Sequence, residues 1–209
     1  EMLSQTDGLT GLFRRGPFDN RIKEEFKRAG AFKTSLGLMI LDIDHFKRIN
    51  DAYGHQAGDL ILKQTASILK DSVYETDFVA RYGGEEFAVV LPVTSKIQAE
   101  PILQRVCGAI KKERIMIDHE RLLTCSAGLA SVPEDAGTVD DLLRLADDAL
   151  YQAKAAAPRR TFPVPASQTK PGSNRDVEAR NAIISRMKPR TRTTPITSGA
   201  FSLRVWSRS

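Results

Sequence analysis

The chain has 209 residues, 41% of them hydrophobic, which is enough apolar material for one domain of ordinary size. With two cysteines, no apolar run as long as a membrane span and no signal-peptide pattern at its start, the sequence argues against a disulfide-stabilised secreted domain and favours a cytoplasmic one. The net charge of +5 is uneven: up to Lys154 there are 20 Lys and Arg against 24 Asp and Glu, and from Ala155 onward there are 11 against 2.

The first half of the chain predicts alternating helices and strands. Residues 17–31 have the apolar spacing of a helix. The run 36–41 is almost wholly apolar, which suits a central strand covered on both faces, and Asp42 terminates it. Residues 50–59 interleave polar groups with glycines, so we interpret them as an ordered loop that enters a helix over 57–70.

The second half begins with a predicted hairpin. Residues 78–82 and 87–91 are strand-like, and the Gly83-Gly84 pair between them indicates a tight turn with positive φ. The remaining predicted elements are a helix near 96–112, a strand near 122–131 and a helix over 139–156. This order predicts an α/β sandwich of the α+β kind, in which helices pack around a mixed or antiparallel sheet.

Residues 158–209 differ from the rest in being rich in Pro, Ser, Thr and Arg. We expect them to be mostly disordered, with a short helix over 177–187 as the exception. The abrupt change favours the hypothesis of a shifted reading frame, which a comparison of the coding DNA in all frames would test. Counterion release gives a basic tail some affinity for any polyanion, but the tail has no base-reading motif that would indicate a specific nucleic-acid partner.

Acidic residues at the ends of the predicted strands are the first candidates for chemistry. Asp42 follows the apolar strand, and Glu85 and Glu86 lie in the hairpin turn. Each alone is equally well explained as a solvated loop or a solubilising turn. If the strand neighbours the hairpin, Asp42 and Glu85 lie close together and repel unless a metal or a shared proton compensates. Lys47, one turn beyond, would complete a set suited to phosphoryl chemistry.

Polar residues of the segment 50–59 are candidates for reading a base. A carboxylate such as Asp59 accepts hydrogen bonds from N1–H and the exocyclic amine of guanine, and the amide of Asn50 serves both donors and acceptors. The alternative for Asp59 is that it merely favours a helix N-terminus, and His55 has the same ambiguity.

Five segments in this order resemble the GGDEF family of diguanylate cyclases over about residues 5–160. These segments are Asp7-Gly8-Leu9-Thr10-Gly11-Leu12, Asp42-Ile43-Asp44-His45-Phe46-Lys47 with Asn50-Asp51, Gly54-His55 with Gly58-Asp59, Ala80-Arg81-Tyr82-Gly83-Gly84-Glu85-Glu86-Phe87, and Ala149-Leu150-Tyr151-Gln152-Ala153-Lys154. The resemblance implies a palm-like or ferredoxin-like domain of the nucleotidyl-cyclase type over 1–160, followed by a basic tail over 161–209.

The resemblance also implies roles for the residues at matching positions. Mg²⁺ or Mn²⁺ would be held by Asp42, the backbone carbonyl of Ile43 and Glu85, with Glu86 assisting. Glu85 and Lys47 would be catalytic, Glu85 near the ribose 3′-hydroxyl and Lys47 stabilising the transition state. The implied substrate-binding residues are Phe46, Asn50, His55, Asp59, Gly83, Gly84 and Lys154.

The activity that the resemblance implies is condensation of two GTP into cyclic di-GMP plus pyrophosphate across a homodimer. Each domain would hold one GTP, so a monomer could not complete the product. The alternative is a catalytically weak, GTP-binding regulatory module. Because the chain begins almost at the first motif, we also expect a missing upstream sensor domain, which could tether the cytoplasmic domain to a membrane.

Three departures from the family pattern bear on activity. Tyr74 replaces the Arg of the Arg-x-x-Asp motif in the family's inhibitory site, while the Asp is retained as Asp77. An uncharged ring cannot pair with a phosphate, so we expect this site to be absent. Arg14 stands where the family usually has Asn, and Pro158 stands where it has an Arg that helps to hold the phosphates. The last departure favours the regulatory alternative.

Overall fold

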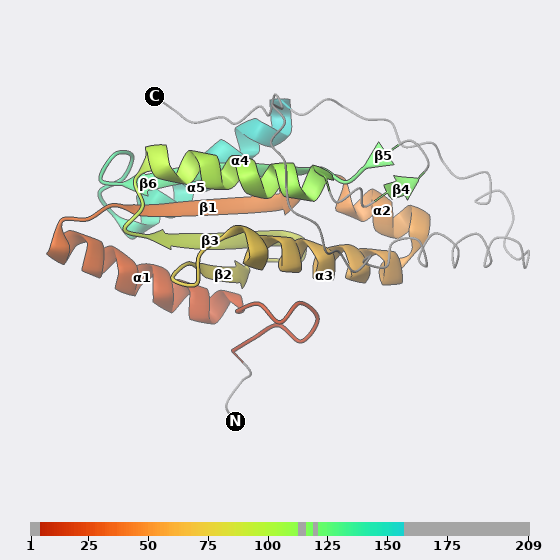
Figure 1. The fold of residues 1–209 in the computed structure, drawn as a ribbon, viewed down its shortest axis with the longest axis horizontal. Helices are drawn as coiled ribbons and strands as arrows, with labels where there is room; N and C mark the ends of the chain where they lie inside the picture. Colours follow the sequence, from red (N-terminus) through yellow and green to blue (C-terminus); the bar gives the residue numbers. More distant parts are fainter. Residues whose placement is uncertain (1–4, 113–115, 119–120, 157–209) are drawn as a thin grey trace, which may run out of the picture.

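The computed structural model describes residues 5–112, 116–118 and 121–156 (Figure 1). In chain order the elements are α1 (Arg15–Phe32), β1 (Leu36–Ile43), α2 (Phe46–Tyr53), α3 (His55–Ser72), β2 (Phe78–Arg81), β3 (Glu86–Pro92), α4 (Lys96–Lys112), β4 (Met116–Asp118), β5 (Arg121–Leu122), β6 (Cys125–Val132) and α5 (Val139–Ala156). Every predicted helix and strand within these ranges is confirmed, with ends that shift by up to three residues. The expected disordered tail, the helix over 177–187 and the domain boundary after residue 160 lie outside the described residues.

The main sheet is antiparallel throughout, with the strand order β2-β3-β1-β6. β1 lies between β3 and β6, and all eight of its residues are buried. Helices cover both faces of the sheet, so β1 meets apolar side chains on each side, and for this reason it is an almost continuous apolar run.

The two faces of β1 pack against different helices because alternate residues of a strand point to opposite sides. Leu36, Leu38 and Ile40 belong to the core formed with α1 and α5. The alternate residues, such as Met39 and Leu41, belong to the core formed with α2, α3 and α4. Asp42 continues the first series, so its side chain is on the α1 and α5 side of the sheet. Among the described residues, no helix is both long enough and apolar enough to cross a membrane.

The interpretation of residues 50–59 as a loop is wrong. Residues 46–53 form α2, and α3 begins at His55, directly after the sharp turn at Gly54, whose φ is 85°. Phe46 and Ile49 are buried on one side of α2. A two-turn helix has too few apolar positions for its period to be recognised among polar residues and glycines.

The strand near 122–131 is shorter than predicted. β6 starts at Cys125, and β5 pairs instead with β4 in a separate two-stranded sheet. Strands of two and three residues are too short for an alternating pattern to reveal them.

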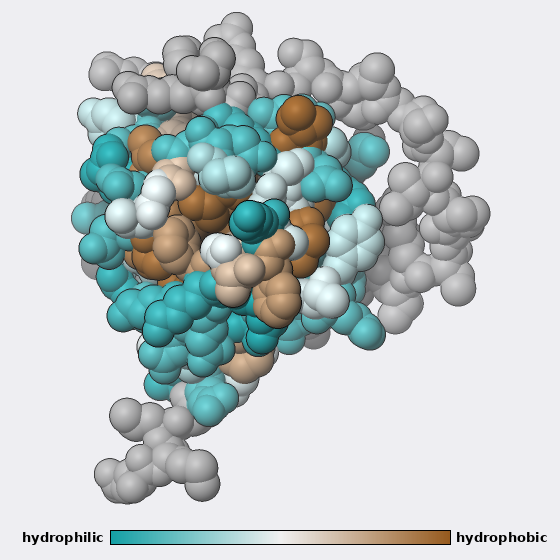
Figure 2. Space-filling model, turned by 90° about the vertical axis from the view of Figure 1, so that its left-hand side faces the viewer, coloured by the Kyte–Doolittle hydropathy of each residue, from teal (hydrophilic) through white to brown (hydrophobic). Residues whose placement is uncertain are grey.

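The two ends of the main sheet differ in character. Figure 2 shows the end at which β1 begins and β3 finishes, where apolar side chains gather in the centre and hydrophilic ones surround them. Large apolar residues are unusually exposed here: Phe32 is 74% exposed and Val93 67%, and both line the same groove. At the opposite end, Asp42 pairs with Glu86.

The close packing of α5 on β6 depends on Gly128. A Cβ at this position would collide with the carbonyl oxygen of Ala146 and the amide nitrogen of Leu150, both in the backbone of α5. We therefore expect Gly128→Ala to lower the free energy of unfolding by at least about 2 kcal/mol, because a backbone cannot rotate away as a side chain can. Chemical denaturation measures this change.

Gly30→Ala is the matched control, because a Cβ at Gly30 in α1 has no other atom within 4 Å. It should raise stability by up to about 1 kcal/mol through helix propensity. A Gly128→Ala protein as stable as the wild type would contradict the close approach of α5.

Candidate active site

The connection between β2 and β3 is the turn Tyr82–Glu85. The amides of Tyr82 and Gly83 both donate to the carbonyl oxygen of Glu86, at 2.8 and 3.1 Å. Neither Gly83 nor Gly84 has a φ in the left-handed region, so the expectation of positive φ is wrong. Space explains Gly83 instead, because a Cβ there would collide with the Glu86 carboxylate, whereas a Cβ at Gly84 would meet nothing.

The pairing of β1 with β3 brings the acidic candidates to one end of the sheet. Asp42 pairs with Glu86, and the amide of Ile43 donates to the carbonyl oxygen of Glu85 at 3.3 Å. The apolar strand therefore neighbours the hairpin, which was the condition for Asp42 and Glu85 to act together.

Asp42 is 5% exposed, and its Oδ2 lies 2.8 Å from Nζ of Lys154 on α5. Burial raises the pKa of Asp42, an increase that Lys154 opposes and the charge of Asp44 reinforces. Burial also raises the pKa of Glu85, and the charge of Asp42 raises it further. The charge of Asp42 thus disfavours the ionised form of Glu85, and Lys154 opposes this effect only in part.

This donor set fits a hard divalent cation. The carboxylates of Asp42 and Glu85 and the carbonyl of Ile43 are oxygen ligands, and the raised pKa values of the acids show that further positive charge would stabilise them. In the described part of the chain, no three His, Cys, Asp or Glu side chains gather into a metal cluster.

The other candidates lie on α2 and α3. Lys47 is exposed in the first turn of α2, and His55 and Asp59 are exposed at the start of α3. Asn50 is half-buried, and its Oδ1 is buried without a hydrogen-bond partner. Phe46 is buried in the core, so its side chain packs inside the protein and does not face solvent.

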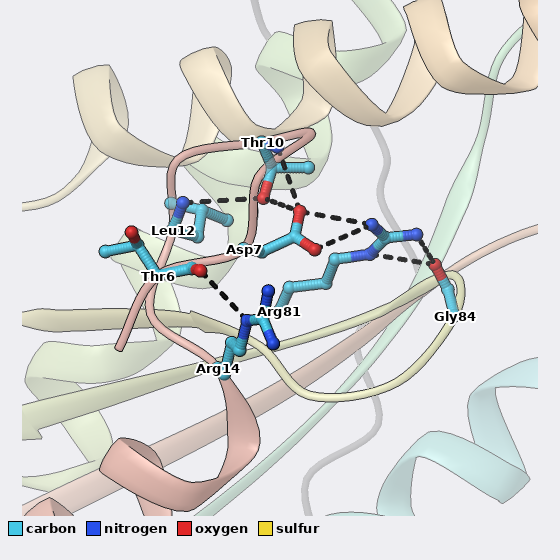
Figure 3. A network of polar contacts seen from close by, with 7 residues as sticks. All are labelled: Thr6, Asp7, Thr10, Leu12, Arg14, Arg81 and Gly84. Carbon is cyan, nitrogen blue, oxygen red and sulfur yellow. Dashed lines mark hydrogen bonds and ion pairs between the residues drawn. The ribbon is translucent and has the colours of Figure 1, made fainter. Parts of the chain in front are cut away.

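Arg81, to which the sequence assigned no role, holds the turn in place (Figure 3). Its Nε and one terminal nitrogen donate to the carbonyl oxygen of Gly84 at 3.1 and 2.7 Å. Its other terminal nitrogen donates to both carboxylate oxygens of Asp7 at 3.1 Å. The side chains of Arg81 and Asp7 are only 18% and 20% exposed, so solvent screens this pair less than a surface ion pair.

Asp7 is itself fixed by its own turn. The hydroxyl and the amide of Thr10 donate to its Oδ1 at 2.7 and 2.9 Å. Burial acts to raise the pKa of Asp7, but the hydrogen bonds from Thr10 and Arg81 outweigh it and lower the pKa. An Asp-x-x-Thr turn and an Arg before the glycines are visible in the sequence, but nothing in it pairs two residues 74 positions apart.

The segment before α1 also adds to the sheet edge. Phe13 forms an isolated bridge with Ala80, and its carbonyl oxygen accepts from the amide of Arg81 at 2.8 Å. The ring of Phe13 stacks on that of Phe78, with centroids 4.2 Å apart. These contacts and the Asp7–Arg81 pair fasten the start of the domain to the hairpin.

The region in which the family has its inhibitory site is occupied by local contacts in this chain. The exposed ring of Tyr74 lies 5.8 Å from the guanidinium of Arg105, which also donates to the carbonyl oxygen of Ser72 at 2.6 and 3.0 Å. Asp77 accepts from the amide of Tyr74 at 2.8 Å. The charged groups that remain here are therefore engaged within the chain.

Known proteins resemble this chain in both sequence and structure. A family model described as "Diguanylate cyclase, GGDEF domain" matches residues 4–160. The diguanylate cyclase DgcP of Pseudomonas aeruginosa is 44% identical over 153 residues, which are 72% of this chain and 22% of that protein. The chain spans between 22% and 42% of the length of DgcP and two further curated relatives.

Two solved structures are similar over most of their length. The GGDEF domain of DgcB from Caulobacter crescentus, in complex with c-di-GMP, has a TM-score of 0.69 and 32% identity, covering 77% of this chain and 95% of that one. The active GGEEF domain of a diguanylate cyclase from Vibrio cholerae has a TM-score of 0.64 and 29% identity, covering 68% of this chain and 90% of that one. With its Gly83-Gly84-Glu85-Glu86-Phe87 turn at the end of the β1–β3 pair, the chain belongs to the GGDEF family of diguanylate cyclase domains.

Proposed function

We propose that this domain condenses two molecules of GTP into cyclic di-GMP and pyrophosphate, in a homodimer in which each chain holds one GTP. The observation that carries the proposal is the buried Asp42 beside Glu85 at the end of the sheet. It is supported by a relative, DgcP, that is named as a diguanylate cyclase and by a similar GGEEF domain that is described as active.

We further propose Mg²⁺ or Mn²⁺ as the cofactor, held by the carboxylates of Asp42 and Glu85 and the carbonyl oxygen of Ile43, with Glu86 assisting. When bound, such an ion supplies positive charge that stabilises the phosphates during transfer.

Two lysines are suited to the phosphates. Lys47 is exposed in the first turn of α2, where the helix has no side-chain cap and its N-terminal amides attract anions. Lys154 is half-exposed although it pairs with Asp42, so its ammonium group can serve the carboxylate and a phosphate from one place. We assign transition-state stabilisation to Lys47 and ground-state binding to Lys154.

Asn50 and Asp59 are the proposed guanine-reading residues, with His55 beside them. The unpaired Oδ1 of Asn50 supports this role, because it is an acceptor that a hydrogen-bond donor of the base can satisfy. A carboxylate at position 59 accepts from N1–H of guanine, whereas N1 of adenine is an acceptor and would face it unfavourably.

In the proposed reaction, the carboxylate of Glu85 accepts the proton of the 3′-hydroxyl of its GTP. The 3′-oxygen attacks the α-phosphorus of the partner's GTP, the bond from that phosphorus to the bridging oxygen breaks, and pyrophosphate leaves. The same step in the opposite direction closes the ring.

A second candidate is a GTP-binding regulatory module with weak turnover. Pro158, which lies outside the described residues, favours it because proline cannot replace the charge of a phosphate-holding arginine.

Incubation of the purified chain with GTP and Mg²⁺ should yield cyclic di-GMP, with a rate per chain that rises with protein concentration as dimers form.

Glu85→Gln should lower the rate at least about 100-fold, because an amide cannot accept the proton. Chromatography of the nucleotides measures both. Glu24→Gln, at an exposed acid of α1, is the matched control and should retain the wild-type rate. GTP binding without product at high protein concentration would support the regulatory module instead.

Arg81→Lys should lower kcat by about tenfold while changing the unfolding temperature little. An ammonium is a point charge and cannot bridge Asp7 and the carbonyl oxygen of Gly84 as the guanidinium fork does. Steady-state kinetics and thermal unfolding test this. Arg144→Lys is the control, because its pairs with Asp141 and Asp148 are on the exposed face of α5. Equal kcat for Arg81→Lys and the wild type would refute a role of Arg81 in positioning the turn.

Tyr74→Arg should create inhibition by the product, because a guanidinium beside Asp77 and Arg105 can bind a phosphate of cyclic di-GMP bidentately. We expect its dissociation constant for cyclic di-GMP to be at least about tenfold lower than that of the wild type. Calorimetry and initial rates with added product measure the effect. Glu75→Arg places the same guanidinium one residue away, with a larger change in net charge, and should not reproduce the inhibition. Strong inhibition of the wild type would contradict the loss of the site.

A further inference from the structure

Gly58 is buried at the end of the first turn of α3, in a place where the backbone does not require glycine. Its φ is not in the left-handed region, and glycine inside a helix is less stable than alanine. Space accounts for it, because a Cβ at Gly58 would collide with Oδ1 of Asn50 and would lie only 3.0 Å from Cγ of Asn50 and Cζ of Phe46. The side chain of Asn50 therefore lies directly against the backbone of α3.

Several contacts fix Asn50 in this position. The backbone carbonyl oxygen of Asn50 accepts a hydrogen bond from the backbone amide of Gly54 at 2.8 Å, and this bond ends α2 at the turn into α3. Phe46, one turn earlier on α2, is anchored in the core and lies over Gly58 as well. The amide of Asn50 is thus held between the two helices, with its Oδ1 buried and unpaired while the residue as a whole is half-exposed.

We propose that Gly58 is a specificity-determining positioning residue: its lack of a side chain lets the Asn50 amide lie where, together with Asp59, it reads the guanine of GTP. Gly58 contacts neither the base nor the reacting atoms and acts through Asn50. The inference rests on the proposed function, because it takes Asn50 to be a base-reading residue. It adds the requirement that residue 58 of α3 has no side chain, which the residues proposed to contact the nucleotide would not by themselves reveal.

Gly58 lies beside a proposed base-reading residue and away from the residues proposed for proton transfer and metal binding. Asp42 and Glu85 lie at the ends of β1 and the hairpin, and Lys47 is in the first turn of α2. The three atoms nearest to a Cβ at residue 58 belong instead to Asn50 and Phe46. Displacement of the Asn50 amide should therefore weaken recognition of the base and leave proton transfer and phosphate contacts in place. Such a change raises KM more than it lowers kcat.

The test is Gly58→Ala, which should raise KM for GTP at least about tenfold, change kcat less than about threefold and reduce the preference for GTP over ATP. Calorimetric titration with a non-reactive GTP analogue should show the same loss in affinity. Gly30→Ala is the matched control, since it makes the same substitution in a helix where a Cβ has open space, and it should bind as the wild type does.

A double-mutant cycle shows whether Gly58 acts through Asn50. Asn50→Ala removes Oδ1 and Cγ of Asn50 and leaves Cζ of Phe46, 3.0 Å from the new Cβ, as the remaining close contact. Adding Gly58→Ala to Asn50→Ala should therefore cause much less loss of affinity than Gly58→Ala causes in the wild type. If Gly58→Ala alone does not fold, the double variant should still fold and bind like Asn50→Ala. Additive losses, or a double variant that does not fold, would overturn the inference.

The failure of this inference is distinguishable from that of the proposed function. A wild-type protein that does not bind the GTP analogue would refute the proposed function and, with it, the role given to Asn50. A wild type that binds the analogue and a Gly58→Ala variant that binds it equally well would refute only the role of Gly58.

Discussion

The antiparallel register of β1 and β3 sets the position of every acidic group in the site. Because Asp42 pairs with Glu86, a slip of one residue would turn Asp42 to the other face of the sheet, into the core beneath α2, α3 and α4. The apolar residues that alternate along β1 prevent this slip, since each would also move to the wrong face. The same packing that stabilises the fold therefore buries the carboxylate of Asp42 beside Glu85, where the charge of Asp42 raises the pKa of Glu85.

Three small structural devices convert this register into a defined site. The guanidinium of Arg81 ties the backbone of the turn to the start of the domain. The bare Cα of Gly83 leaves room for the Glu86 carboxylate, and that of Gly58 leaves room for the Asn50 amide. Arg81 holds the backbone of the turn, and the two glycines leave space for a neighbouring polar side chain. The geometry of the site thus depends on residues to which the proposed reaction assigns no contact with the nucleotide.

The sequence predicted what is encoded locally. The apolar run that ends at Asp42 and the long helices are correct, because their periodicity spans enough residues. Helix α2 is only two turns long and was missed, and the glycines of the turn were assigned a positive φ that they do not have. The ion pairs Asp7–Arg81 and Lys154–Asp42 join segments far apart in the chain, and no local pattern reveals which distant charges meet.

Along β6, the backbone of α5 leaves room for nothing larger than hydrogen at position 128. A position this crowded favours glycine, and it lets the backbone of the helix lie directly against the strand. The ammonium group of Lys154 is carried on that helix, so its height above Asp42 is set by a contact that side-chain repacking cannot change.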